Sequence, residues 1–118
     1  MFKRGFCVTL CAAFMLILFT CAAGAVTFVN IGTGSTGGSY YPLGATMAKI
    51  WNDHLEGIKA SAQSTGGTVN NIELMGSAEA DAAFMDGLYY YAYLGKGRYE
   101  DNPQGYIRAM VPLYPEPT

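Results

Sequence analysis

Apolar and polar residues follow one another along the middle of the chain in a pattern that predicts strands and helices in turn. Val26–Ile31 is rich in β-branched residues and predicts a first strand. Over residues 41–56 the apolar positions recur at helical spacing, while Pro42 suits the first turn of a helix and Gly57 suits its carboxyl end. A strand followed by a helix is therefore expected at the start of the domain.

The same alternation continues to the end of the chain. Ile58–Gln63 predicts a second strand, and a helix carrying Val69, Ile72 and Met75 is expected to follow it. The remaining expectations are a turn at 76–81, a short strand at 82–85, a helix at 88–94, a polar loop at 96–105, and a fourth strand or a helix at 106–113. Repeated βα units of this kind predict an α/β fold with a mainly parallel sheet and helices on both faces.

Two short segments rich in glycine and hydroxyl residues follow the first two predicted strands. The sequence Ser-Thr-Gly-Gly with a further hydroxyl residue occurs at residues 35–39 and again at 64–68. Parallel strands bring both segments to one edge of the sheet, and each segment leads into a helix whose first N–H groups lack intrahelical partners. Glycine allows close approach to the backbone, and the helix dipole favours negative charge. The pair predicts a site for a small anion.

A basic segment and then an apolar one open the chain. Two basic residues precede the apolar stretch at 6–20, and the small residues Ala23-Gly24-Ala25 follow it. This pattern is typical of a secretory signal peptide, which we assign to residues 1–25 with cleavage before Val26. An uncleaved membrane anchor is the alternative, and it leaves everything after Val26 on the same outer side. Lipid attachment at Cys21 fits the flanking residues less well.

Composition excludes several classes of function. All three cysteines, Cys7, Cys11 and Cys21, lie in the amino-terminal segment, so a mature chain has no thiol for a disulfide, for catalysis or for a metal. Loss of that segment also changes the net charge from −2 to −4, which gives no support for nucleic-acid binding. His54 is the only histidine, and no serine lies in a G-x-S-x-G motif. We therefore expect no enzyme activity, no metal and no cofactor.

A nucleotide-binding α/β enzyme domain is an alternative, because the glycines at 32, 34 and 37 have G-x-G-x-x-G spacing. A ribose-binding acid is required at the end of the second strand, where this chain has Gln63 and Ser64. Glu56 comes before that strand. No lysine follows either glycine pair, which excludes a Walker loop. The residues fit this alternative less well than they fit a binding protein.

Four segments together resemble one family, in the same order and at the same spacing. They are GTGSTGGSYYPLGATMAKIWN at 32–52, AQSTGGTVNNIELMGSAEADAAF at 62–84, YYAY at 90–93 and LYPEP at 113–117. These segments resemble the TAXI family of periplasmic receptors for tripartite (TRAP) transporters. The resemblance implies a periplasmic binding protein whose two α/β lobes close on a small carboxylate or amino acid, such as glutamate or 2-oxoglutarate. The implied partners are the membrane subunits of a TRAP transporter.

The resemblance also implies a domain organisation and a set of ligand contacts. Residues 26–118 would form an incomplete first lobe, and a truncated fragment without transport function is the alternative. Amides at the helix starts after Gly37 and Gly66 would hold the carboxylate, and the ring of Tyr40 would pack on the carbon chain of the ligand. Independently of the resemblance, the tyrosines at 89–93 lie on several faces of a predicted helix; they are expected to pack against the sheet, and a hydroxyl of one of them in the cleft is the alternative. The predicted ligand-binding residues are Thr36, Gly37, Gly38, Ser39, Tyr40, Ser64, Thr65, Gly66, Gly67 and Asp86.

Overall fold

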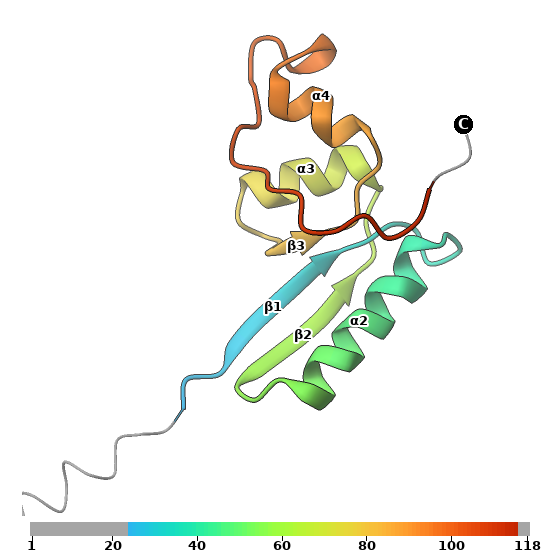
Figure 1. Ribbon diagram of the computed structural model, residues 1–118, viewed down its shortest axis with the longest axis vertical. Coiled ribbons are helices and arrows are strands. Elements are labelled where there is room, and N and C mark those ends of the chain that lie inside the picture. Colours follow the sequence, from blue (N-terminus) through green and yellow to red (C-terminus); the bar gives the residue numbers. More distant parts are fainter. Residues whose placement is uncertain (1–23, 116–118) are drawn as a thin grey trace, which may run out of the picture.

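The computed structural model describes residues 24–115, which form a three-stranded parallel sheet with helices packed around it (Figure 1). The strand order is β2-β1-β3, and the central strand β1 is parallel to both neighbours. The elements are β1 (Thr27–Gly32), α2 (Tyr40–His54), β2 (Ile58–Gln63), α3 (Thr68–Gly76), β3 (Ala82–Ala83), α4 (Leu88–Leu94) and the 3-10 helix η1 (Gly97–Tyr99). The predicted α/β fold class is confirmed.

Residues 1–23, which hold all three cysteines and most of the predicted signal peptide, lie outside the described residues. Within 24–115, no helix has both the length and the apolar composition needed to cross a bilayer.

Helices α2 and α3 lie on opposite faces of the sheet. Successive residues of a strand point to opposite faces, and Ile31 packs with Ala48 of α2. The next residue, Gly32, faces α3, since a Cβ atom placed on it would lie 2.8 Å from the side-chain oxygen of Asn71. The two βα units therefore cover the central strand from both sides, as the alternating pattern predicts.

Each face has its own apolar cluster. Between α2 and the sheet, the buried residues Ile31, Ala48 and Phe84 pack together, and Tyr40 and Trp51 contact them. A second cluster joins α3 and α4 to the segment that follows them. Its buried members are Ile72, Ala92, Tyr99 and Ile107.

Helix α4 packs on α3 and not on the sheet, so the expectation that its tyrosines contact the sheet is wrong. Ala92 is the buried residue of this helix, and Tyr89 packs against the second cluster. Tyr90, Tyr91 and Tyr93 are exposed. The physical reason is that β3 is only two residues long, so the sheet offers α4 little surface.

Strand β3 ends earlier than the predicted strand at 82–85. The N–H of Phe84 still donates to the carbonyl of Gly32 at 2.9 Å. Beyond that point, side chains of α3 satisfy the backbone: Asn71 Nδ2 donates to the Phe84 carbonyl at 2.7 Å, and the Asp86 N–H donates to Thr68 Oγ1 at 3.0 Å. These bonds replace a strand ladder and turn the chain away from the sheet.

The predicted fourth strand or helix at 106–113 is wrong, because this segment has no regular secondary structure. No strand among the described residues lies beside it to form a ladder, and Pro112 lacks an N–H to donate. The segment is tied to α3, where the Tyr106 hydroxyl donates to the Ile72 carbonyl at 2.7 Å. Partial burial raises the pKa of the Tyr106 hydroxyl, and the neighbouring Tyr99 raises it further.

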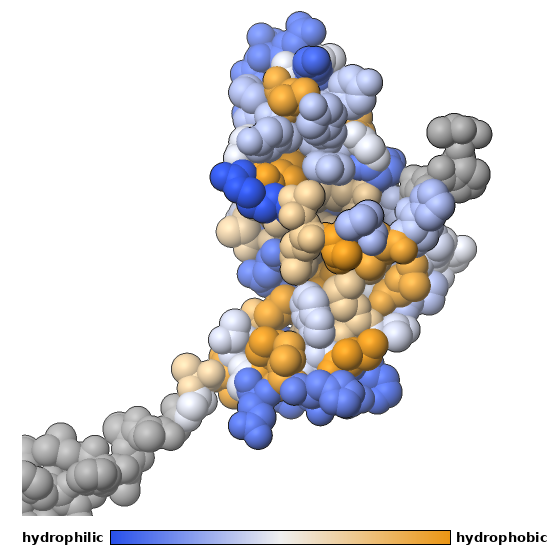
Figure 2. Space-filling model, viewed as in Figure 1, coloured by the Kyte–Doolittle hydropathy of each residue, from blue (hydrophilic) through white to orange (hydrophobic). Residues whose placement is uncertain are grey.

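Exposed apolar side chains gather over the middle of the molecule and over β1, β2 and α2, whereas hydrophilic residues predominate at its two ends (Figure 2). Phe28 of β1 is 76% exposed, and Met110 of the final segment is 79% exposed. Leu43 and Ile50 of α2 are also exposed. Such gathering of apolar residues on a surface is typical of a face that other protein covers.

Candidate functional site

The two glycine loops, residues 33–39 between β1 and α2 and residues 64–67 between β2 and α3, lie side by side at the carboxyl edge of the sheet. The parallel order of the strands predicts this arrangement. The backbone N–H of Thr65 donates to the Gly34 carbonyl at 3.1 Å, and the Ser64 hydroxyl donates to the same carbonyl at 3.0 Å. The Thr65 hydroxyl donates to the Thr33 carbonyl at 3.0 Å. These bonds join the two loops directly and fix their relative position.

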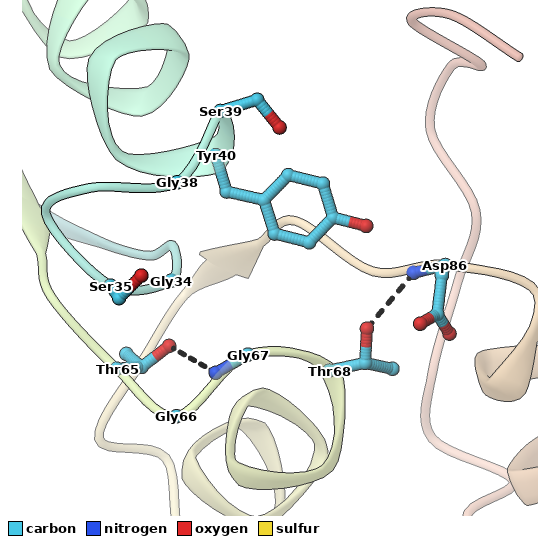
Figure 3. A pocket seen from close by; sticks show the side chains of 10 residues that line it. All are labelled: Gly34, Ser35, Gly38, Ser39, Tyr40, Thr65, Gly66, Gly67, Thr68 and Asp86. Carbon is cyan, nitrogen blue, oxygen red and sulfur yellow. Dashed lines mark hydrogen bonds between the residues drawn. The ribbon is translucent and has the colours of Figure 1, made fainter. Parts of the chain in front are cut away.

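A hollow of about 450 Å³ lies between the loops and the start of α4 (Figure 3). Sites for small molecules in proteins usually have volumes of about 300 to 1,000 Å³. The hollow is lined by Gly34, Ser35, Gly38, Ser39, Tyr40, Thr65, Gly66, Gly67, Thr68 and Asp86. Its walls therefore come from both loops, both helix starts and the turn before α4.

Seven of the ten predicted ligand-binding residues line this hollow. They are Gly38, Ser39, Tyr40, Thr65, Gly66, Gly67 and Asp86. The other three, Thr36, Gly37 and Ser64, do not line it, and the hydroxyl of Ser64 is instead bonded to the Gly34 carbonyl. The role of all ten in binding a ligand stays a prediction.

Three lining residues were not predicted: Gly34, Ser35 and Thr68. Thr68 is the last residue of the second Ser-Thr-Gly-Gly repeat and corresponds to Ser39 of the first. The internal repeat was therefore a sufficient signal for Thr68. Its hydroxyl also accepts the Asp86 N–H, so it connects the second loop to the far wall of the hollow.

The backbone of the second loop requires glycine at one position. Gly67 has φ 88° and ψ −158°, a region that residues with a Cβ atom avoid. Its N–H donates to Thr65 Oγ1 at 3.1 Å, and the Gly66 N–H donates to Asn70 Oδ1 at 3.1 Å. The N–H groups of both glycines are thus already bonded, that of Gly67 within the loop and that of Gly66 to a side chain of α3.

The first turn of α3 has backbone N–H groups without intrahelical acceptors. The first intrahelical bond runs from the Asn71 N–H to the Gly67 carbonyl at 2.9 Å. The N–H groups of Thr68, Val69 and Asn70 precede that bond and belong to the set that a helix start leaves without intrahelical acceptors. A negative group placed there also interacts favourably with the helix dipole.

The first loop contributes a tight turn, a hydroxyl and an aromatic ring. The Gly38 N–H donates to the Ser35 carbonyl at 2.9 Å, which closes the turn before α2. The Ser39 hydroxyl lies 3.1 Å from that of Tyr114. The ring of Tyr40 lines the hollow and packs on the ring of Phe84, with centroids 5.7 Å apart. This packing holds the Tyr40 ring in place beside the hollow.

Asp86 is the one charged residue among those that line the hollow. Its Oδ1 accepts the N–H of Leu88 at 2.9 Å, at the beginning of α4. The lining set contains no lysine, arginine or histidine. The lining set therefore offers an anion N–H groups and hydroxyls but no basic side chain.

Other candidate chemistry lies away from the hollow. His54 is an exposed residue in the last turn of α2, at the opposite end of the helix from the loops. Glu56 precedes β2 and so lies at the amino edge of the sheet, far from where a ribose-binding acid would stand. Within 24–115 there is no group of three or more His, Cys, Asp and Glu side chains that could hold a metal ion.

The sequence matches the model of one known protein family. The profile described as the NMT1-like family matches residues 31–118, a span that includes both glycine loops and Asp86. The chain belongs to the NMT1-like family. This family resembles periplasmic binding proteins and is not a family of enzymes. Membership indicates an extracytoplasmic protein that binds a small molecule. The parallel sheet and its helices are consistent with part of a lobe of such a protein.

Proposed function

We propose that this NMT1-like chain captures a small carboxylate or amino acid, such as glutamate or 2-oxoglutarate, as the solute receptor of a TRAP transporter. The observation that carries the proposal is the meeting of two glycine loops around one hollow lined by hydroxyls and helix starts. Family membership and the resemblance of four ordered segments to TAXI receptors support it.

The ligand carboxylate is proposed to bind at the start of α3. Its oxygens would accept the N–H groups of Thr68 and Val69, and the hydroxyl of Ser39 would donate from the opposite loop. Hydrogen bonds to a charged group contribute about 1.5 to 3 kcal/mol each when water is excluded. The Tyr40 ring would pack on the carbon chain. No basic side chain is needed, because the N–H groups and the helix dipole supply the positive potential.

Residues 26–118 are proposed to form one wall of a two-walled cleft. Small-molecule sites bury about 70 to 90% of the surface of the ligand, which an open hollow on one lobe does not achieve. Hydrogen bonds to a half-solvated ligand compete with water and contribute near the lower end of their range. Binding by this lobe alone is therefore expected to be weak, with a dissociation constant in the millimolar range.

The protein is proposed to be exported and to begin at Val26 after processing. The basic residues at the start, the apolar stretch and Ala23-Gly24-Ala25 support this. Intact-mass spectrometry of the periplasmic fraction is expected to give a chain that starts at Val26. A chain in that fraction that still carried Met1 would contradict the proposed cleavage before Val26.

Gly66→Val tests the ligand site. A Cβ atom at Gly66 would lie 3.4 Å from Asn70 Cβ, an ordinary contact, so the fold should accept the change. Gly66 lines the hollow, so the two added methyl groups would occupy space there. We expect binding of glutamate to weaken at least about tenfold, which corresponds to only about 1.4 kcal/mol. The measurement is an NMR titration at millimolar ligand.

His54→Gln is the matched control for that titration. The residue is at the far end of α2, roughly 20 Å from the loops at 1.5 Å per helical residue. The His54→Gln variant should bind glutamate as the unaltered protein does. If Gly66→Val and His54→Gln weakened ligand binding equally, the glycine loops would not be part of the binding site.

A further inference from the structure

We propose that Asp86 makes the hollow select ligands that carry an ammonium group in addition to a carboxylate. The cargo would then be an amino acid, and a dicarboxylate without an amino group would be rejected. This inference rests on the proposed function, because it assigns the second charge of the same ligand to another residue that lines the same hollow.

The position of Asp86 relative to the loops supports this assignment. In Figure 3 the glycine loops lie on one side of the hollow and Asp86 lies on the other, with Tyr40 and Thr68 between them. A ligand whose carboxylate reached the start of α3 would extend along Tyr40 toward Asp86. The start of α3 and Asp86 are neighbours, because the Asp86 N–H donates to Thr68 Oγ1 at 3.0 Å. A positive helix start beside a negative side chain matches a zwitterion.

Two hydrogen bonds fix the position of Asp86 at the edge of the hollow. Its backbone N–H is bonded to Thr68 Oγ1 at 3.0 Å, and its Oδ1 accepts the Leu88 N–H at 2.9 Å. A carboxylate can accept about four hydrogen bonds, so the single N–H from Leu88 leaves acceptor capacity for an ammonium. The side chain is partly buried, which reduces the screening of its charge by water.

The lining set contains no cationic side chain, so the charge of Asp86 determines which ligands the hollow favours. An anionic ligand without an ammonium brings negative charge beside Asp86, and no lysine or arginine lines the hollow to offset the repulsion. An α-ammonium converts that repulsion into attraction. Discrimination that combines attraction of one ligand with repulsion of its analogue is a common route to specificity.

Glutamate and glutarate differ only by the α-ammonium group, so they are the matched ligands for the test. Titrations followed by backbone amide NMR would use the protein purified as the cell processes it. We expect the unaltered protein to bind glutamate at least tenfold more tightly than glutarate. In Asp86→Asn that preference should disappear, mainly through weaker binding of glutamate.

Asp86→Asn is suited to this test because asparagine keeps an oxygen that can accept the Leu88 N–H. Asp86→Ser, which also offers an acceptor at a helix start, provides a second neutral variant if the first does not fold. Asp53→Asn is the charge-matched control. It removes one negative charge from the exposed ion pair with Lys49 near the far end of α2, and it should keep the preference for glutamate.

The outcomes separate this inference from the proposed function. If the unaltered protein binds glutarate as tightly as glutamate, or if Asp86→Asn keeps the preference, Asp86 does not select an ammonium and the carboxylate site still stands. If neither ligand changes any amide signal of the hollow in the unaltered protein, the proposed function is contradicted and this inference falls with it.

Discussion

Asn71→Asp is expected to unfold much of the protein at neutral pH. Asn71 is completely buried and its Nδ2 donates to the carbonyls of Thr33 and Phe84, both at 2.7 Å. Aspartate has nearly the same shape but no N–H. The Phe84 carbonyl then loses the Asn71 donor, the Thr33 carbonyl keeps the Thr65 hydroxyl as a donor, and both carbonyls face a carboxylate. Leaving a buried polar group unsatisfied costs about 1 to 3 kcal/mol for each, which is a large part of the roughly 5 to 14 kcal/mol expected for a domain of this size.

The pH dependence of this variant gives a second readout. Burial raises the pKa of the introduced carboxyl above its unfolded value, so the folded state binds a proton more tightly than the unfolded state. The free energy of unfolding should therefore rise as the pH falls below 7, and the difference in melting temperature from the unaltered protein should shrink. Thermal denaturation followed by circular dichroism measures both effects.

Asn70→Asp is the control, since it makes the same change in the neighbouring residue. The side-chain oxygen of Asn70 accepts the Gly66 N–H, which a carboxylate can also do, and negative charge near the start of α3 is favourable. Its melting temperature should stay close to that of the unaltered protein. Equal melting temperatures for Asn70→Asp and Asn71→Asp would show that Asn71 does not join the strand ends.

Gly44→Val is expected to lower the free energy of unfolding by about 3 kcal/mol through overpacking. A Cβ atom on Gly44 would overlap the methyl group of Thr33 and approach the Phe84 ring to 3.3 Å. Thr33 is completely buried and its hydroxyl donates to the Gln63 carbonyl at 2.6 Å, so its methyl cannot rotate away without breaking that bond. Helix α2 would have to move off the sheet.

Gly87→Ala provides the comparison for Gly44→Val. Gly87 has φ −56° and ψ −12°, which alanine adopts freely, and a Cβ atom there would have no neighbour within 4 Å. Urea denaturation should give this variant the same midpoint as the unaltered protein or a slightly higher one, because alanine restricts the unfolded chain. A Gly44→Val midpoint equal to that of Gly87→Ala would contradict the close packing of α2 on β1.

Local sequence patterns predicted the helices and the longer strands, in which backbone hydrogen bonds lie within one helix or along an extended pair of strands. The apolar spacing and terminal signals placed α2 within two residues at each end, and Ile58–Gln63 and Leu88–Leu94 agree with the structure. The patterns failed where side chains satisfy the backbone. At 82–85 the ladder is replaced by bonds from Asn71 and Thr68, and nothing local in the sequence indicates that replacement.

The candidate site was predicted to the extent that it follows from the repeated glycine loops. Parallel strand order was enough to bring the loops together, and Tyr40 and Asp86 do line the hollow. The sequence could not indicate that the hydroxyl of Ser64 turns away to the Gly34 carbonyl. It also could not reveal that Asn71, a polar residue in a helix, is buried and joins two strand ends, because that role depends on tertiary contacts.

The most direct test of the carboxylate site is a map of backbone amide shifts during titration of the isotope-labelled protein with glutamate. We expect amide chemical shifts that change and saturate at millimolar glutamate. The largest changes should be at Ser39, Thr68 and Val69, where α2 and α3 begin beside the hollow. Shifts centred on the exposed tyrosines of α4, or no saturable shift at Thr68 and Val69, would contradict the proposed carboxylate site.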